Sequence, residues 1–124
     1  MIPQFELGPL IAERQMEFEA PTGERIPVTV RVGLPRVHAR EPRETWVCPL
    51  QIEGLGSPQV RGFFGVDAMQ ALLLCVHIIP SELGHHLRKN GGRFLFLGGS
   101  DSSFVSSCRS ALEYCGDTFP AEAQ

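Results

Sequence analysis

Two adjacent histidines and two cysteines are the residues of this chain that most invite a metal-site interpretation. His85 and His86 are neighbours, Cys108 and Cys115 lie seven residues apart, and both residue types bind zinc. Adjacent residues of a helix point about 100° apart, and residues at i and i+7 are roughly 10 Å apart along its axis. The pattern also lacks the Cys-x-x-Cys spacing of common zinc sites. We therefore expect no metal site, with exposed histidines and core cysteines.

Two further groups could support ligand binding or catalysis. Residues 100–103, Ser-Asp-Ser-Ser, follow two glycines at an expected helix start, where free backbone amides attract anions. They lack the lysine and the spacing of a phosphate-binding P-loop, so helix capping explains them. Cys75 and His77 could form a nucleophile and its base, since such groups need only be adjacent in space, but they stand in the most apolar stretch. We expect no catalytic residue, no cofactor and no enzymatic activity.

The composition is that of one globular domain. The chain has 124 residues, of which 43% are hydrophobic and 20% charged. This composition excludes a largely disordered chain, and the length suffices for one core. We therefore expect a single domain over residues 1–124. The net charge of -3 argues against a dedicated nucleic-acid binder, which normally carries a basic face.

No segment of the chain has the pattern of a secretion signal or a membrane span. The first residues lack a basic stretch followed by an apolar run. The longest apolar run, near residues 71–79, contains His77 and stops at Pro80, short of the ~20 residues that span a bilayer. We expect a cytoplasmic protein without a membrane partner, whose cysteines are reduced and mostly buried.

Charge is distributed unevenly along the first third of the chain. Five glutamates stand against Arg14 up to residue 24, and five arginines stand against Glu41 in residues 25–43. This pattern suggests two oppositely charged surfaces that would steer a charged partner, with solvated strand faces as the alternative. The proline- and arginine-rich residues 33–44 predict an exposed loop suited to binding. The candidate partner-binding residues are Glu13, Glu17, Glu19, Arg36, His38, Arg40 and Phe63.

Alternating apolar and polar residues predict four strands that form an antiparallel meander. The predicted strands cover residues 11–19, 26–32, 45–53 and 60–66. In the fourth strand, one face is formed by Val60, Gly62, Phe64 and Val66. Phe63 then points to the other side of the sheet, where it could meet solvent or a partner.

Asp67 and Gln70 mark the start of a helix, because they can form a capping box with the free amides of its first turn. The residues that follow are apolar at most positions, so we expect the sheet or a second element to cover most of the helix circumference. Pro80 should kink or end this helix near residue 79. A more polar helical segment then covers residues 81–90.

A fifth strand and a last helix complete the predicted order. Residues 94–97 are apolar at successive positions, as in a strand covered on both faces. Apolar residues then recur at helical spacing at Phe104, Cys108, Ala111, Leu112 and Cys115. The sequence therefore predicts an α+β fold: a four-stranded antiparallel meander, then a buried helix, a fifth strand and a C-terminal helix.

Three short segments of the chain resemble a family of uncharacterised small bacterial proteins. They are Ile-Glu-Gly-Leu-Gly at 52–56, Gly-Val-Asp-Ala-x-Gln-Ala-Leu at 65–72 and Phe-Leu-Gly-Gly at 96–99. The resemblance covers about residues 10 to 100. It implies a fold and supplies no catalytic residues, and residues 102–115 depart from it as an added helix.

Three functions are consistent with this sequence. Small acidic bacterial proteins of this kind often bind other proteins, so we expect a protein-binding module and, more narrowly, an immunity protein that neutralises a cognate toxin by occlusion. The first alternative is a small enzyme or ligand binder with a pocket between helix and sheet, near His77 or Cys75. The second is a homodimeric structural protein paired through a sheet edge. Fold and size alone do not decide among them.

Overall fold

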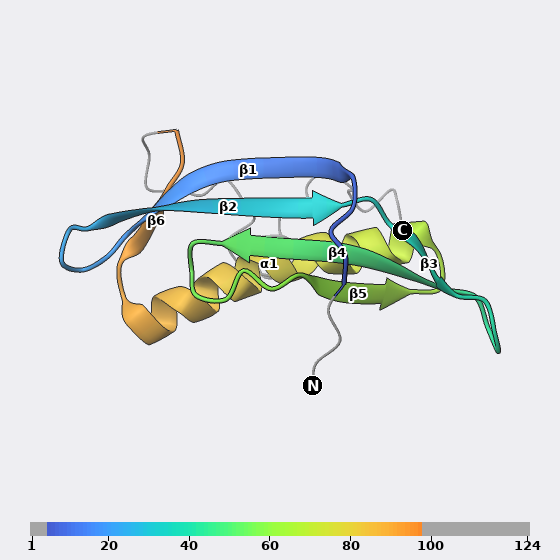
Figure 1. Ribbon diagram of the computed structural model, residues 1–124. Coiled ribbons are helices and arrows are strands. Elements are labelled where there is room, and N and C mark those ends of the chain that lie inside the picture. Colours follow the sequence, from blue (N-terminus) through green and yellow to red (C-terminus); the bar gives the residue numbers. More distant parts are fainter. Residues whose placement is uncertain (1–4, 98–124) are drawn as a thin grey trace, which may run out of the picture.

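Residues 5–97 are described by the computed structural model, which has an α+β fold: an antiparallel sheet with a long helix against one face (Figure 1). The strands are β1 (Leu10–Glu19), β2 (Arg25–Gly33), β3 (Arg36–Ala39), β4 (Thr45–Glu53), β5 (Arg61–Gly65) and β6 (Arg93–Leu95). The helix is α1 (Ala68–Asn90). The C-terminal helix expected around residues 104–115 lies outside the described residues.

The predicted meander is confirmed within a larger sheet. Antiparallel pairing joins β1 to β2, β2 to β4 and β4 to β5, and β6 adds beside β1. The predicted loop over residues 33–44 is wrong in its centre, because β3 forms there and pairs with the start of β4. The only large apolar residue of β3 is Val37, so the strand has no alternating pattern that the sequence could reveal.

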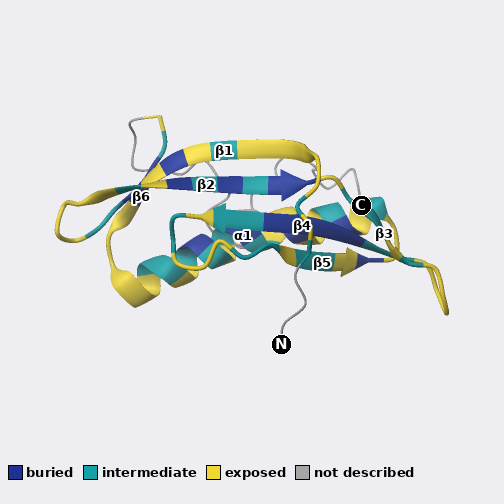
Figure 2. Cartoon of the chain, in the orientation of Figure 1, coloured by how far each residue is buried: buried dark blue, intermediate teal, exposed yellow. Residues whose placement is uncertain are grey.

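The core lies between the sheet and α1. Alternate residues of β2, and Met16 and Phe18 at the end of β1, turn toward the helix and are buried, as predicted, whereas the first part of β1 is largely exposed (Figure 2). The buried core residues are Met16, Phe18, Val28, Val30, Val32, Cys48, Leu50, Ala71, Cys75, Ile79, Leu83 and Phe94. We call the helix-facing side of the sheet the inner face and the opposite side the outer face. β4 is buried on its outer face too, at Val47 and Pro49.

The predicted faces of β5 are reversed. Phe63 stands opposite Cys48 of β4, so it shares the inner face and packs against the core. Phe64 lies on the outer face and is exposed, and Val66 after the strand is exposed as well. Two consecutive phenylalanines make the alternation ambiguous, so the pattern alone assigns the wrong one inward. The expectation that Phe63 faces solvent is therefore wrong.

The capping box predicted at the start of α1 is confirmed in outline. The Asp67 carboxylate accepts a hydrogen bond from the backbone N–H of Gln70 at 2.8 Å. The Gln70 side chain accepts one from the N–H of Val66 at 2.7 Å, one residue earlier than in the usual box. After the helix, Gly91 has φ 72° and donates its N–H to the carbonyl of Leu87 at 2.7 Å. Hydrogen bonds thus define both ends of α1.

Pro80 does not end α1, which continues as one helix to Asn90. Proline lacks the N–H that would bond to the carbonyl four residues earlier, so it removes one bond of the ladder. Ile79 and Leu83, on either side of Pro80, are both buried. Their packing holds both halves of the helix on the sheet. Of the predicted kink or end near residue 79, the end is therefore wrong.

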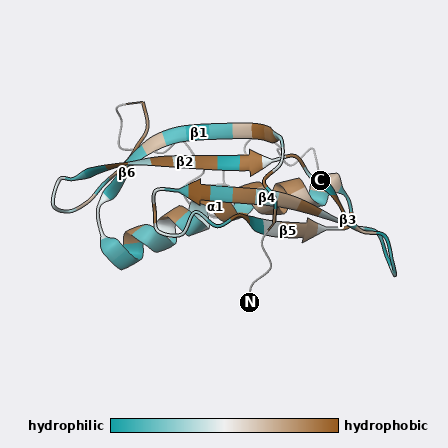
Figure 3. Cartoon of the chain, viewed as in Figure 1, coloured by the Kyte–Doolittle hydropathy of each residue, from teal (hydrophilic) through white to brown (hydrophobic). Residues whose placement is uncertain are grey.

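α1 is buried along one stripe. Its buried residues recur every four positions, at Ala71, Cys75, Ile79 and Leu83. On the far side Met69 and Leu73 are 70% and 61% exposed. The prediction that most of the helix circumference is covered is therefore wrong within residues 5–97. The hydrophobic character of α1 falls toward its C-terminal turns (Figure 3).

We expect Asp67→Ala to lower the free energy of unfolding by about 0.5–2 kcal/mol, because the first-turn amides of α1 lose their acceptor. Chemical denaturation followed by circular dichroism measures this change. Asp67→Ser keeps an acceptor oxygen and should retain most of the stability. Equal stability of the wild type and the alanine variant would show that the cap contributes nothing.

Candidate functional site

The first half of α1 presents an apolar surface to solvent. We use the name helix patch for the exposed apolar residues that line one hollow there, namely Met69, Leu73 and Leu74 of the helix and Val66 just before it. They surround a shallow hollow of about 610 Å³, whose polar lining comes from Asp67, Gln70 and His77. Because the buried stripe on the opposite side of α1 fixes the helix to the sheet, the core holds the helix patch in place.

The β3–β4 hairpin projects from the same end of the molecule as the start of α1 (Figure 1). At its base, on the outer face, the rings of His38 and Phe64 meet edge to face with centroids 4.9 Å apart. Toward the tip, Arg40 pairs with Glu44 at 2.9 Å. Of the predicted partner-binding residues of this segment, His38 and Arg40 are exposed and Arg36 is partly buried. The hairpin and the helix patch therefore form one end of the molecule.

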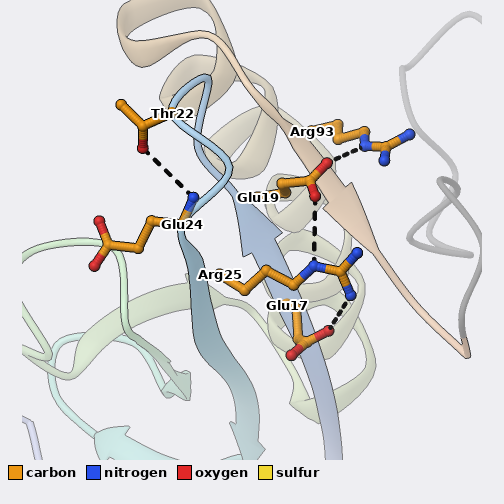
Figure 4. A network of polar contacts seen from close by, with 6 residues as sticks. All are labelled: Glu17, Glu19, Thr22, Glu24, Arg25 and Arg93. Carbon is orange, nitrogen blue, oxygen red and sulfur yellow. Dashed lines mark hydrogen bonds and ion pairs between the residues drawn. The ribbon is translucent and has the colours of Figure 1, made fainter.

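The glutamates of β1 are already paired with arginines of β2. Arg31 lies 2.9 Å from Glu13. Arg25 lies 3.5 Å from Glu17 and 3.4 Å from Glu19 (Figure 4). Because β1 and β2 are adjacent and antiparallel, their opposite charges meet across the strand pair. The predicted pair of oppositely charged surfaces is therefore wrong, since the outer face carries a mixed network whose charges pair with one another.

Glu19 is held by a second arginine from another strand. Its other carboxylate oxygen accepts a hydrogen bond from Arg93 at 2.6 Å, beside the paired strands β1 and β6 (Figure 4). This hydrogen bond lowers the pKa of Glu19, and the positive charges of Arg93 and Arg25 lower it further. A partner that used Glu19 would have to displace both arginines, which makes the acidic residues of β1 poor candidates for the main contact.

The buried thiols are unsuited to nucleophilic chemistry. Cys48 and Cys75 are free and fully buried, as predicted, and burial raises the pKa of both thiols. The thiolate is the nucleophile, so a raised pKa suppresses reactivity at neutral pH. His77 is exposed and lies about 200° around the helix from Cys75. The structure therefore does not bring these two residues together, and Cys108 and Cys115 lie outside the described range.

A polar groove runs between the second half of α1 and the turn that joins β4 to β5. It has a volume of about 480 Å³, and its lining includes Ser57, Glu82, His85, His86, Lys89 and Asn90. Glu82 lies 3.3 Å from Arg61, and His86 packs edge to face on Phe18 with ring centroids 4.6 Å apart. Burial lowers the pKa of His86, and the charges of His85 and Lys89 act in the same direction. Across residues 5–97, no three His, Cys, Asp or Glu side chains gather where they could hold a metal ion.

Sequence reasoning missed the helix patch because it assigned these residues to the core. A signal was present in the spacing. Ala71, Cys75 and Ile79 recur every four residues, so Met69 and Leu73 fall on the other side of the same helix.

In the described part of the chain, no helix is apolar over a length that could cross a membrane.

Comparison with protein families gives a match over most of the chain. The matching family model is described as a domain of unknown function, DUF6968, and it covers residues 12–105. No curated protein and no solved structure matches the chain. The match runs from β1 to beyond β6, so it spans the sheet and α1.

We expect Glu19 to titrate below its ordinary pKa of 4.5 and Arg93→Gln to raise that pKa, because the variant removes the main hydrogen bond to the carboxylate. NMR titration of the side-chain carboxyl measures both values. Because the folded pKa is lowered, the stability that Glu19 contributes is present above its unfolded pKa and is lost as the pH falls through the folded value. Arg88→Gln removes an arginine from α1 and serves as the control. An unchanged Glu19 pKa in Arg93→Gln would contradict this account.

Proposed function

Since the chain belongs to the DUF6968 family, whose function is unknown, we propose a function from its surface: the domain is a protein-binding module. The observation that carries this proposal is the helix patch. Exposed apolar patches rimmed by polar residues are typical of interaction sites, and Asp67, Gln70 and His77 form such a rim. The patch lies on a helix that is anchored by its buried side, so binding requires little ordering of the backbone.

A partner that binds the helix patch must also contact neighbouring parts of the domain. A stable interface buries about 800 Å² on each partner, which is more than four side chains supply. The β3–β4 hairpin lies at the same end of the molecule (Figure 1) and carries Arg40, which is exposed, whereas His38 and Phe64 lie on the outer face of the sheet. Met69 is unbranched and can adapt to the shape of a partner, while Arg40 can hydrogen-bond at the rim.

More narrowly, the proposed partner is a bacterial toxin, and the domain acts in the cytoplasm as an immunity protein that neutralises its cognate toxin by occlusion. One feature supports this step: the apolar contact surface of the domain is held by the core. Occlusion requires a fitting surface and no chemistry from the domain itself. Because immunity genes lie beside their toxin genes, the neighbouring gene supplies the partner for the test.

We expect the product of the neighbouring gene to co-purify with the wild-type chain and to bind Met69→Glu at least about tenfold more weakly, because the new charge would be buried without a partner. Cells that express the toxin should survive with the wild type and die with this variant. Leu10→Glu places the same charge on an exposed apolar residue of β1 and should bind as the wild type does.

Thermal unfolding of the variants separates loss of binding from loss of fold. Absence of both co-purification and rescue with the wild type would refute the toxin proposal. Equal weakening by Met69→Glu and Leu10→Glu, with both variants folded, would exclude the helix patch as the contact surface.

A second candidate function is favoured by the polar groove. A small-molecule binder or small enzyme needs a concave site with a few convergent polar groups. Glu82, His85 and Lys89 converge on the groove, although neither His77 nor Cys75 takes part. The groove faces away from the helix patch along α1, so the two candidate functions use different residues and can be tested separately.

If the groove binds a small molecule, a panel of metabolites should contain a compound that raises the melting temperature of the wild type. His85→Ala should abolish that shift, because it removes a polar group from the groove lining. Met69→Glu, on the other half of α1, should retain it. A shift of equal size in His85→Ala, or no shift with any compound of the panel, would argue against this candidate.

A further inference from the structure

Two cysteines, Cys48 of β4 and Cys75 of α1, meet in the core. Neither side chain is exposed to solvent. The Cys48 thiol donates to the carbonyl of Gly33 at 3.4 Å, and the Cys75 sulfur lies 3.9 Å from the carbonyl oxygen of Pro49, the residue after Cys48. Each thiol also lies within hydrogen-bonding contact of the other. A thiol from the sheet and a thiol from the helix thus lie side by side.

The register between α1 and β4 produces this contact. The helix begins beside Gly65, which pairs with Trp46 near the start of β4, and its last turn lines the polar groove beside the turn that follows β4, so the two elements run in the same direction. Four helix residues advance by about 6 Å, and two strand residues advance by about 7 Å. Ala71 lies against Gly65. One turn later, Cys75 therefore lies over Cys48, two residues after Trp46.

Small residues bring the helix close to the sheet at this level. A Cβ atom on Gly65 would lie 2.5 Å from the backbone nitrogen of Ala71, so the first turn of α1 almost touches β5. A disulfide joins two residues whose Cα atoms are only about 4.4–6.8 Å apart. The glycine and the alanine one turn before the cysteine pair permit such an approach between α1 and the sheet.

The first half of α1 is held less firmly than the second half. Ala71 and Cys75 are smaller than Ile79 and Leu83, so they bury less apolar surface against the sheet. Pro80 removes one hydrogen bond of the helix between the two halves. The first half can therefore open briefly while the second half stays packed. In the closed fold, burial raises the pKa of both thiols and keeps them unreactive, so any reaction proceeds from this opened state.

We propose that Cys48 and Cys75 are a redox-sensitive pair, which forms a disulfide between β4 and α1 when the domain meets a small-molecule disulfide such as oxidised glutathione. In the opened state one cysteine loses its proton and attacks the reagent, which releases one reagent thiol and leaves a mixed disulfide on the protein. The other cysteine then displaces the second reagent thiol. In total, two cysteine thiols are oxidised to one disulfide, and one reagent disulfide is reduced to two thiols.

The disulfide would tie the half of α1 that carries the helix patch to the centre of the sheet. In a reducing compartment both thiols stay reduced, and the bond forms only when small disulfides accumulate. The proposal concerns the core alone, so it holds whichever partner the domain binds.

Oxidation of the full, folded chain with oxidised glutathione tests this proposal. After the remaining thiols are alkylated, mass spectrometry of tryptic peptides identifies the bonded cysteines. Trypsin cuts after Arg61, so Cys48 and Cys75 fall on separate peptides, and their disulfide is detected as one linked pair that a reducing agent splits. We expect this pair as the main product. The melting temperature should rise by at least about 5 °C, because the bond constrains the unfolded chain.

Cys75→Ala is the matched control. It keeps Cys48, Cys108 and Cys115, so any rise in melting temperature caused by another disulfide remains, and we expect no rise. If Cys75→Ala fails to fold by circular dichroism, Cys48→Ala tests the same bond from β4. Absence of the linked pair, or its formation only after denaturant has unfolded the chain, would overturn the proposal. An equal rise in melting temperature in the control, or no rise in the oxidised wild type, would overturn it too.

Discussion

The close contact between the end of β5 and the first turn of α1 fixes the surface on which the rest depends. Gly65 is buried, and a Cβ atom there would lie 2.5 Å from the backbone nitrogen of Ala71. Only glycine permits this approach, so the strand passes into the helix with almost no connecting loop. The Asp67 cap then sets where the helical turns begin. Ala71 is thereby aimed at the sheet, and Met69 is aimed at solvent.

Strand pairing likewise determines which charged residues of the outer face lie next to one another. Arg31 lies between Glu13 and Glu53, at 2.9 Å from each, because β2 runs between β1 and β4. Exposed pairs of this kind add little to stability. Their larger effect is on recognition, since charges that pair within the domain have less to offer a partner. The apolar helix patch has no comparable use inside the described domain, which is why it carries the functional argument.

The parts of the fold that are determined by a local sequence pattern could be predicted from the sequence. β4 has the predicted bounds of 45–53, and the Asp67 cap is where the sequence placed it. The parts that depend on a neighbour could not be predicted. β3 is a strand because β4 pairs with it, and Phe63 rather than Phe64 faces inward because of its register against Cys48. The candidate site was missed for the same reason, since the exposure of α1 depends on how much of the helix the sheet can cover.

The two halves of α1 divide the surface of the domain by chemistry. Before Pro80 the exposed residues are mostly apolar and include Met69 and Leu73, while after it the exposed positions include His85 and Lys89. A helix that only completed the core would gain nothing from apolar residues on its solvent side, because their exposure brings no burial energy. Their position beside a projecting hairpin instead fits a partner that covers this end of the molecule. The polar half, with its groove, offers hydrogen-bonding groups suited to a small ligand, so each half of α1 corresponds to one of the two candidate functions.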